Sequence, residues 1–140
     1  MPLTLAEANL IVRGAIERAQ RLNLHVSVAV CNECGRLIAF NRMDGTYEDI
    51  SRLSIGKAIV SAGSGLPSGK VAGLVEHTPV DVVVGESAPV MCARGGLPTL
   101  RAGKIEGACG VAGAPSYDQD EECARSGIAC LGPELCVPSV

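Results

Sequence analysis

Two cysteines separated by two residues are the first candidates for chemistry. Cys31 and Cys34, in "CNECGR", have the spacing of half a zinc knuckle or of a redox-active dithiol. A redox-active pair uses a helix N-terminus to lower its thiol pKa, but a strand-like segment follows here. A structural zinc site needs four ligands, and the other cysteines form no second pair with this spacing. A zinc or redox protein is one hypothesis, beside the simpler interpretation of turn residues.

Histidines and phosphate loops offer little further chemistry. The two histidines are His25, at the start of a strand-like segment, and His77. Each type of position is more typical of a boundary residue than of a ligand. The stretch "GSGLPSGK" has five residues between Gly63 and Gly69, where a phosphate-binding loop has four. No G-x-S-x-G motif indicates a serine hydrolase.

Two segments have the composition of anion or carboxylate sites. "RGGLP" (94–98) places adjacent glycines beside Arg94, and successive backbone N–H groups there can form an anion-binding nest. A tight turn is the equal alternative. "YDQDEE" (117–122) places carboxylates in the first turn of a helix, where they are favoured by the helix dipole. Capping is therefore the default, and a ligand role for Asp120 or Glu121 is the alternative.

Composition indicates a single domain built from aliphatic residues. Of 140 residues, 47% are hydrophobic but only 2% are aromatic, and 17 are glycine. A chain of this length can bury a core without disulfides. The mean hydropathy of +0.28 is high for a soluble monomer, so we expect a homo-oligomer that covers part of this surface.

The net charge and the lengths of the apolar segments argue against two classes of partner, nucleic acids and membranes. The net charge is −3 and no run of Lys or Arg exists, which argues against nucleic acid. No stretch reaches the ~18 apolar residues of a membrane span, so no membrane partner is expected. The N-terminus lacks the basic region of a signal peptide, so we expect a cytoplasmic protein whose cysteines are thiols.

The elements that would position these residues alternate between helices and strands. Thr4 and Glu7 form a capping box for a helix that ends near Asn23. Residues 25–31 and 36–42 are strand-like, which places the cysteine pair at a hairpin tip. A second helix is predicted from near Thr46 to Gly63, and a short one over 67–76.

The second half is predicted to be rich in strands. Strands are expected over 89–93, 97–101 and 104–113, with Ala102-Gly103 as a two-residue hairpin loop. Ser116 and Gln119 cap a last helix over 118–131, and the tail 132–140 is not assigned. Local hairpins make the sheet mainly antiparallel. We expect one α/β domain over residues 1–140.

Four segments together carry a family resemblance. They are "LNLHVSVAVCNECGRLIAFNRMDGT", "GKAIVSA", "GGLPTLRAGKIEGACGVAGAP" and "QDEECARSGI". In order and spacing they resemble the GlcG/HbpS-like family, also called the haem-degrading or PduO C-terminal-like domain, over residues 4–131. The resemblance implies a profilin-like α+β fold, with a central antiparallel sheet of about five strands flanked by helices. It also implies assembly into dimers up to octamers.

The resemblance also proposes site residues. The family's hairpin has Val-Asp-x-Gly-Gly where this chain has "CNECG", so the cysteine pair is a local variation. The implied ligand pocket contains Arg42, Asp44, Lys57, Gly95, Gly96, Pro98 and Thr99, joined by Asp120 and Glu121. If haem is bound, the candidates for its iron are His25, Thr99 and Cys109.

Lys57 is the most informative of these residues. It lies in the apolar stretch "SIGKAIVSA", where a charge is costly unless it is exposed or paired. If the resemblance holds, its ammonium and the "GGLP" turn converge on one carboxylate. Replacing Lys57 with Met is then expected to preserve the fold and weaken anion binding.

Three functions follow from this sequence. The leading hypothesis is a cytoplasmic, oligomeric protein that binds a small anion or a tetrapyrrole such as haem, as an accessory to a catabolic pathway. The first alternative is an enzyme on a small carboxylated substrate, with Arg42 and Lys57 as anchors and Asp44, Asp120 or Glu121 moving a proton. The second is the metal or redox protein based on Cys31 and Cys34.

Overall fold

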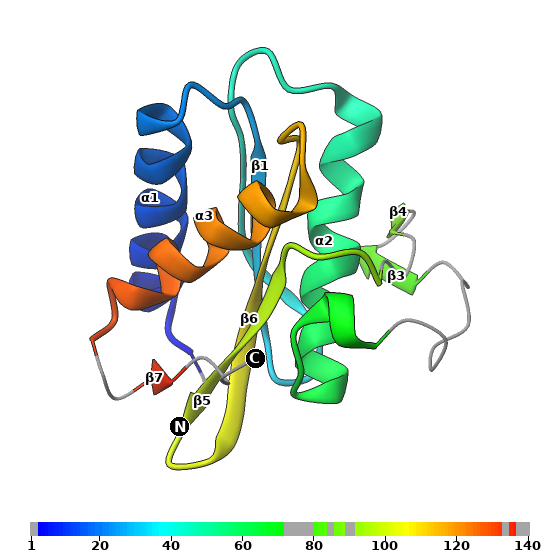
Figure 1. The fold of residues 1–140 in the computed structure, drawn as a ribbon. Coiled ribbons are helices and arrows are strands. Elements are labelled where there is room, and N and C mark those ends of the chain that lie inside the picture. The colour runs from blue at the N-terminus through cyan, green and yellow to red at the C-terminus, as the bar shows by residue number, and fades with distance from the viewer. Residues whose placement is uncertain (1–2, 72–79, 84–85, 89–91, 133–134, 137–140) are drawn as a thin grey trace.

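The centre of the fold is an antiparallel sheet (Figure 1). The computed structural model describes residues 3–71, 80–83, 86–88, 92–132 and 135–136. The strand order is β2-β1-β6-β5-β7, and every neighbouring pair is antiparallel. The strands are β1 (Ser27–Asn32), β2 (Leu37–Arg42), β5 (Gly96–Arg101), β6 (Lys104–Ala112) and β7 (Leu135–Cys136). A separate two-stranded sheet pairs β3 (Val80–Val83) with β4 (Glu86–Ala88). The predicted central antiparallel sheet flanked by helices is confirmed.

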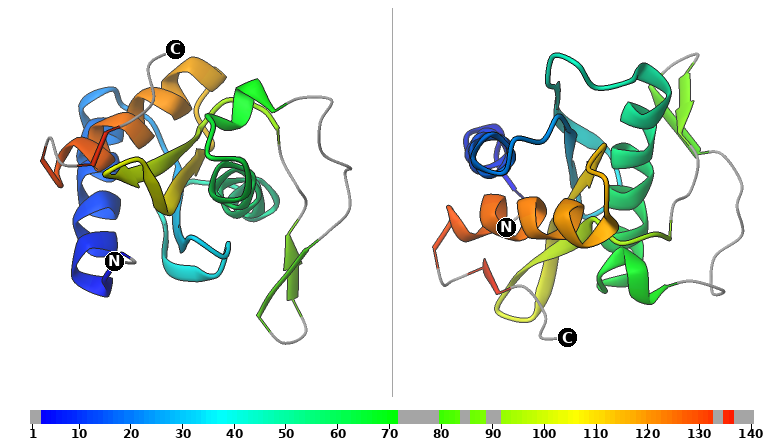
Figure 2. Two further views of the ribbon diagram at one scale, coloured as in Figure 1. Left: turned by 90° about the horizontal axis from the view of Figure 1, so that it is seen from below. Right: turned by 45° about the horizontal axis from the view of Figure 1, so that its top comes forward.

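Three helices cover the two faces of the sheet. Helices α1 (Leu5–Arg21) and α3 (Tyr117–Ala129) lie on one face, and α2 (Glu48–Ser64) lies on the other (Figures 1 and 2). The left view of Figure 2 shows α2 across the strands from α1 and α3. A residue that joins α2 to α3 must therefore reach from one layer to the other.

Alternation along β1 explains why both faces are covered. Val28 and Val30 pack into the larger core with α1 and α3, whereas Ala29 and Cys31 pack against α2. Successive side chains of a strand point to opposite faces, so a strand that is apolar at every position needs cover on both sides. The β1 burial pattern, buried throughout until Asn32, fits this arrangement.

Glycines let α2 lie very close to the sheet. A Cβ atom on Gly110 would overlap the backbone oxygen of Ser54, and one on Gly96 would overlap that of Lys57. Because the backbones approach so closely, the face under α2 needs only small residues such as Ala58, Ala62 and Ala108. A core with few aromatic residues follows from this close packing.

The predicted ends of the elements are mostly confirmed. The Thr4–Glu7 capping box is present, and Asn23 has a left-handed φ of 57° just after α1. Ala102 and Gly103 have φ values of 52° and 78° and join β5 to β6, as a type I′ turn requires. Ser116 caps α3 through the Gln119 N–H.

Several boundaries differ from the prediction. The N-cap of α2 is Tyr47 rather than Thr46, and the helix passes through Gly63 to end at Ser64, with Gly65 left-handed. In the described part of the predicted helix 67–76, the structure has a 3-10 turn at Ser68–Lys70, and Val71 lies outside it. Residues 72–79 and 89–91 lie outside the described residues, and Cys92 and Ala93, expected in a strand, are not part of one. Within the described residues, no helix is long and apolar enough to span a membrane.

Candidate functional site

The single pocket expected from the sequence is two separate sites in the structure. His25, Arg42 and Asp44 line a surface pocket that the other candidates do not line. Lys57 and Asp120 meet in the interior, beside Gly95. We call these the His25 pocket and the Lys57 site.

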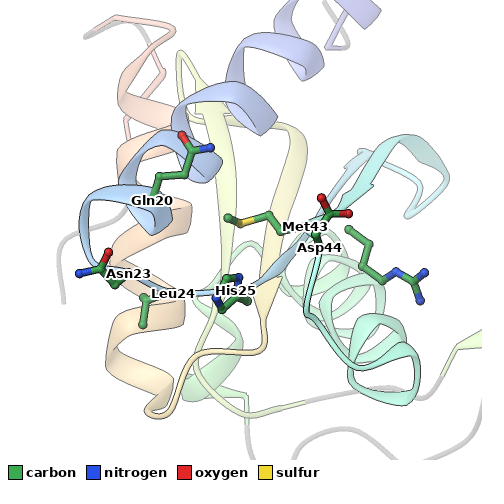
Figure 3. Close-up of a pocket in the computed structure, with 7 residues that line it drawn as sticks. Gln20, Asn23, Leu24, His25, Met43 and Asp44 are labelled. Carbon is green, nitrogen blue, oxygen red and sulfur yellow. The ribbon is translucent and has the colours of Figure 1, made fainter.

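The His25 pocket lies where α1 passes into β1 and β2 passes into α2. It has a volume of about 500 Å³. Its lining residues are Gln20, Asn23, Leu24, His25, Arg42, Met43 and Asp44 (Figure 3). Two chain segments supply these residues, and Figure 3 shows the His25 ring and the Met43 thioether between them. His25, Arg42 and Asp44 are all exposed, so each functional group is accessible to a ligand.

A smaller hollow adjoins the pocket and shares His25 with it. Its volume is about 200 Å³. It is lined by Asn23, Leu24, His25, Gly45, Thr46, Tyr47, Ile50, Gly113 and Pro115. Gly45 has a φ of 87°, and a Cβ there would lie 3.4 Å from Cγ and Nδ1 of His25. The His25 imidazole therefore lies between the two hollows and packs against Gly45.

The chemistry of the His25 pocket suits an anionic, partly apolar ligand with a metal. A neutral imidazole binds iron, and a guanidinium binds carboxylates in a bidentate manner. Leu24 and Met43 supply apolar wall. In the adjoining hollow, Tyr47 is 77% exposed and the Thr46 hydroxyl is buried without a hydrogen-bond partner in the described part of the chain. The donor set at His25 therefore fits haem.

The Lys57 site is a buried ion pair that joins the two helix layers. Lys57, on α2, is 1% exposed, and its Nζ donates to Asp120 Oδ2 of α3 at 3.0 Å. The same ammonium donates to the Val111 carbonyl oxygen at 2.9 Å and lies 5.1 Å from the Tyr117 ring centroid. Asp120 Oδ1 accepts from the Ala114 N–H at 3.0 Å.

Burial opposes both charges of this pair. Desolvation lowers the pKa of Lys57, an effect that Asp120 partly offsets. Desolvation likewise raises the pKa of Asp120, and Lys57 and the Ala114 N–H partly offset it. A Cβ on Gly95 would lie 2.8 Å from Lys57 Nζ, so a glycine is needed where the lysine passes the start of β5.

The remaining predicted anion-site residues have partners of their own. Arg94 pairs with Asp118 at the surface, and Glu121 pairs with Arg125 at 3.2 Å. The Gly96 N–H donates to the buried Ser68 Oγ at 2.8 Å. In this conformation, the Gly96 N–H is therefore not available to an external anion.

Of the three candidates for haem iron, only His25 is accessible. Pro98 and Thr99 of β5 are buried, and the Thr99 hydroxyl has no partner among the described residues. Cys109 is fully buried in the core with α1 and α3, and burial raises the pKa of its thiol strongly. A ligand could reach Thr99 or Cys109 only if the core opened.

The cysteine pair lies at the hairpin tip, as predicted. Cys31 is buried and its Sγ donates to the Ala58 carbonyl oxygen at 3.5 Å, whereas Cys34 is exposed. Asn32 Oδ1 accepts from the N–H groups of Cys34 and Arg36, each at 2.9 Å, which fixes the turn. No group of three potential metal ligands occurs among the described residues. The described part of the chain therefore adds no ligand to this pair.

Several residues of both sites were not identified from the sequence. Gln20, Asn23, Leu24 and Met43 line the His25 pocket, yet their types carry no signal of a site. Tyr117 lies three residues before Asp120, a spacing that places both on one helix face, and this signal could have been used.

Comparison with known proteins identifies relatives of this fold. Residues 3–129 match the family described as haem-degrading protein HbpS-like. Among curated proteins, none matches the sequence. Crystal structures of HbpS and of a double mutant of HbpS from Streptomyces reticuli are each 30% identical, with a TM-score of 0.80. The match covers 94% of this chain in both, and 92% and 88% of those chains, respectively.

A more distant structure has the same fold. The crystal structure of a PduOC:heme complex is 24% identical, with a TM-score of 0.80, and the match covers 99% of this chain and 98% of that one. At this identity the likeness concerns the fold alone. Because the family match spans residues 3–129, this chain belongs to the HbpS-like family.

Proposed function

We propose that this protein binds haem, or a related tetrapyrrole with carboxylate side chains, in the His25 pocket. The observation that carries the proposal is the exposed His25 imidazole, which lines one pocket with the exposed Arg42 guanidinium. His25 would hold the iron, and Arg42 would pair with a propionate. Haem, when bound, would supply an iron centre for redox or ligand chemistry.

Further support comes from the family. Its description names haem degradation, and a structure of the same fold is a haem complex. The apolar wall of Leu24 and Met43 suits the porphyrin ring, and the 77% exposed Tyr47 ring beside the adjoining hollow is available to cover it.

We further propose that the protein is a cytoplasmic homo-oligomer that serves a catabolic pathway as an accessory. The mean hydropathy of +0.28 supports an oligomer, as do the large exposed side chains of Leu5, Leu10, Tyr47 and Tyr117.

The test is a titration with haemin followed by absorbance. Wild type should develop a sharp Soret band that saturates at a fixed stoichiometry, and His25→Ala should lose it. His77→Ala is the matched control because it removes the only other histidine, and it should bind as wild type does. Arg42→Gln should keep the band position and weaken the affinity, since it removes a propionate partner and leaves the iron ligand. An unchanged Soret band in His25→Ala would refute the assignment.

One observation supports the enzyme alternative. Asp44, His25 and Arg42 line the same pocket, so a carboxylate substrate held by Arg42 would face an acid–base pair. Absence of a saturable haem spectrum in wild type, with turnover of a small carboxylic acid that depends on Asp44, would favour this alternative.

A further inference from the structure

We propose that the Lys57 site is a binding site for a small monocarboxylate, which Asp120 blocks from within the chain. This site is separate from the His25 pocket and does not depend on haem binding. In the conformation described here, the Asp120 carboxylate occupies the position that the ligand's carboxylate would take.

The contacts of Asp120 are those of a bound carboxylate. One oxygen accepts from Lys57 Nζ at 3.0 Å, and the other accepts from the Ala114 N–H at 3.0 Å. A cation and a backbone N–H that converge on the two oxygens of one carboxylate form an anion site with two strong donors. The Lys57 ammonium is fixed by Val111 and is 1% exposed, so it is already positioned when the carboxylate leaves.

Exchange of one carboxylate for another preserves the charge of the site. A buried ammonium without a partner is costly, so Asp120 can leave only if another anion replaces it. The replacement returns Asp120 to water and buries the ligand's carboxylate in its place, so the desolvation of the site is nearly unchanged. The ligand must be small, because Lys57 is 1% exposed and its ammonium lies beside the Tyr117 ring.

The position of Asp120 makes this exchange local. It lies four residues after the N-cap Ser116, in the first part of α3, whereas Cys123, Ala124 and Ile128 anchor the rest of the helix in the core. The turn before it carries Tyr117, which is 54% exposed, and Asp118, whose pair with Arg94 is at the surface. Opening this turn would expose the Lys57 site and leave the core of α3 in place.

The class of ligand follows from the two hydrogen-bond donors of the site and from the Tyr117 ring beside it. One ammonium and one N–H match a single carboxylate, and the Tyr117 ring offers an apolar surface to a short hydrocarbon chain. Formate, acetate and propionate are therefore the appropriate probes.

The first experiment measures the melting temperature of the protein as purified, with each probe against chloride at equal ionic strength. Asp120→Ala removes one carboxylate and leaves a space that formate fits. Saturating formate should raise the melting temperature of this variant by roughly 3–6 °C. Lys57→Met/Asp120→Ala is the matched control, and it should show no rise because the cation is gone. A rise in this control equal to that in Asp120→Ala would refute a site at Lys57.

The second experiment tests displacement and does not need the Asp120 variant to fold. Wild type should bind acetate weakly by calorimetry, and Asp118→Asn should bind it a few-fold more tightly, because the surface pair that holds the first turn of α3 is lost. Tyr47→Phe leaves Tyr117 as the sole tyrosine of the chain, so its fluorescence should change with the same dissociation constant. No acetate binding in wild type and no tightening in Asp118→Asn would mean that Asp120 is a permanent partner, which overturns the proposal. Either result is independent of the Soret band that tests the His25 pocket.

Discussion

At the scale of single residues, Lys57 and Asp120 stabilise the fold only as a pair. Each is 1% exposed, and each would be a buried charge without its partner. We therefore predict that Lys57→Met lowers the free energy of unfolding by about 3–5 kcal/mol, as measured by urea denaturation. This differs from the expectation that the fold survives the change unaltered, because the sequence did not show that the lysine is paired in the interior.

The double variant Lys57→Met/Asp120→Leu is the control for this prediction. It replaces both charges with apolar groups, so no unpaired buried charge remains, and it should recover most of the lost stability. If Lys57→Met alone unfolds at the same urea concentration as wild type, the ion pair does not hold the two layers together.

The cysteines should differ sharply in reactivity. Burial raises the pKa of the Cys31 thiol to about 12, and the thiolate is the reactive form. Iodoacetamide at neutral pH should therefore modify the exposed Cys34 and Cys130 and spare Cys31 until the protein is unfolded. Peptide mapping checks this outcome, and rapid modification of Cys31 in the folded protein would contradict its burial.

The same pKa shift has a consequence for alkaline stability. The Cys31 thiol has a pKa near 9.0 when unfolded and about 12 when folded, so above pH 9 the unfolded chain loses protons first. Its contribution to stability is complete below pH 9 and is lost as the pH rises through 12. The urea midpoint should fall between pH 8 and 10.5, and it should fall less in Cys31→Ala. An equal fall in both proteins would assign the effect to other groups.

Site residues were predictable from the sequence to different degrees. Lys57 was identifiable because a charge in an apolar helix demands a partner, and Asp120 because a helix begins there. The pairing of Lys57 with Asp120 was not identifiable, since it depends on the distance between α2 and α3 across the sheet. The positions of Met43 and Leu24 beside His25 likewise depend on how the helices pack on the sheet, and no local sequence pattern predicts this packing.

At the scale of elements, the approach of α2 to the sheet depends on glycine. Gly110→Ala would place a methyl group onto the Ser54 backbone oxygen, where no flexible side chain can yield. We predict a loss of about 1–3 kcal/mol, or failure to fold, measured by urea denaturation.

Gly63→Ala in the same helix is the matched control. Gly63 is exposed, and an added Cβ would contact nothing within 4 Å. This change should stabilise the protein by about 0.5–1 kcal/mol, because alanine favours the helix and restricts the unfolded chain. Equal effects of the two substitutions would show that the helix–sheet distance is not fixed by Gly110.

The elements themselves were mostly predictable, because their ends carry local signals. The capping box at Thr4, the Asn23 stop and the Ala102-Gly103 turn each depend on a few neighbouring atoms, and all three are present. The helix predicted over 67–76 was wrong at Val71. Residues 68–70 form a 3-10 turn instead, and the Ser68 hydroxyl donates to the Ala93 carbonyl oxygen and accepts from the Gly96 N–H. Such distant bonds have no local signature.

At the scale of the whole molecule, the described surface leaves apolar groups without cover. Leu5 is 60% exposed and Tyr47 is 77% exposed, and the edge strand β2 is only half-buried from Leu37 to Phe40. An edge strand that presents unpaired N–H and C=O groups together with apolar side chains favours association with another chain. These features agree with the mean hydropathy of +0.28.

We therefore predict that light scattering at micromolar concentration gives a mass of at least twice the 14.3 kDa of one chain. The physical reason is that burying apolar surface between subunits removes it from water. The chain has few large aromatic side chains that could cover this surface within one subunit. The mass should persist in high salt, because an apolar interface is not screened, whereas an association held by surface ion pairs would weaken. Haemin added at one equivalent per chain should not dissociate the oligomer. A mass of 14.3 kDa at every micromolar concentration would show that the exposed side chains are tolerated by a monomer.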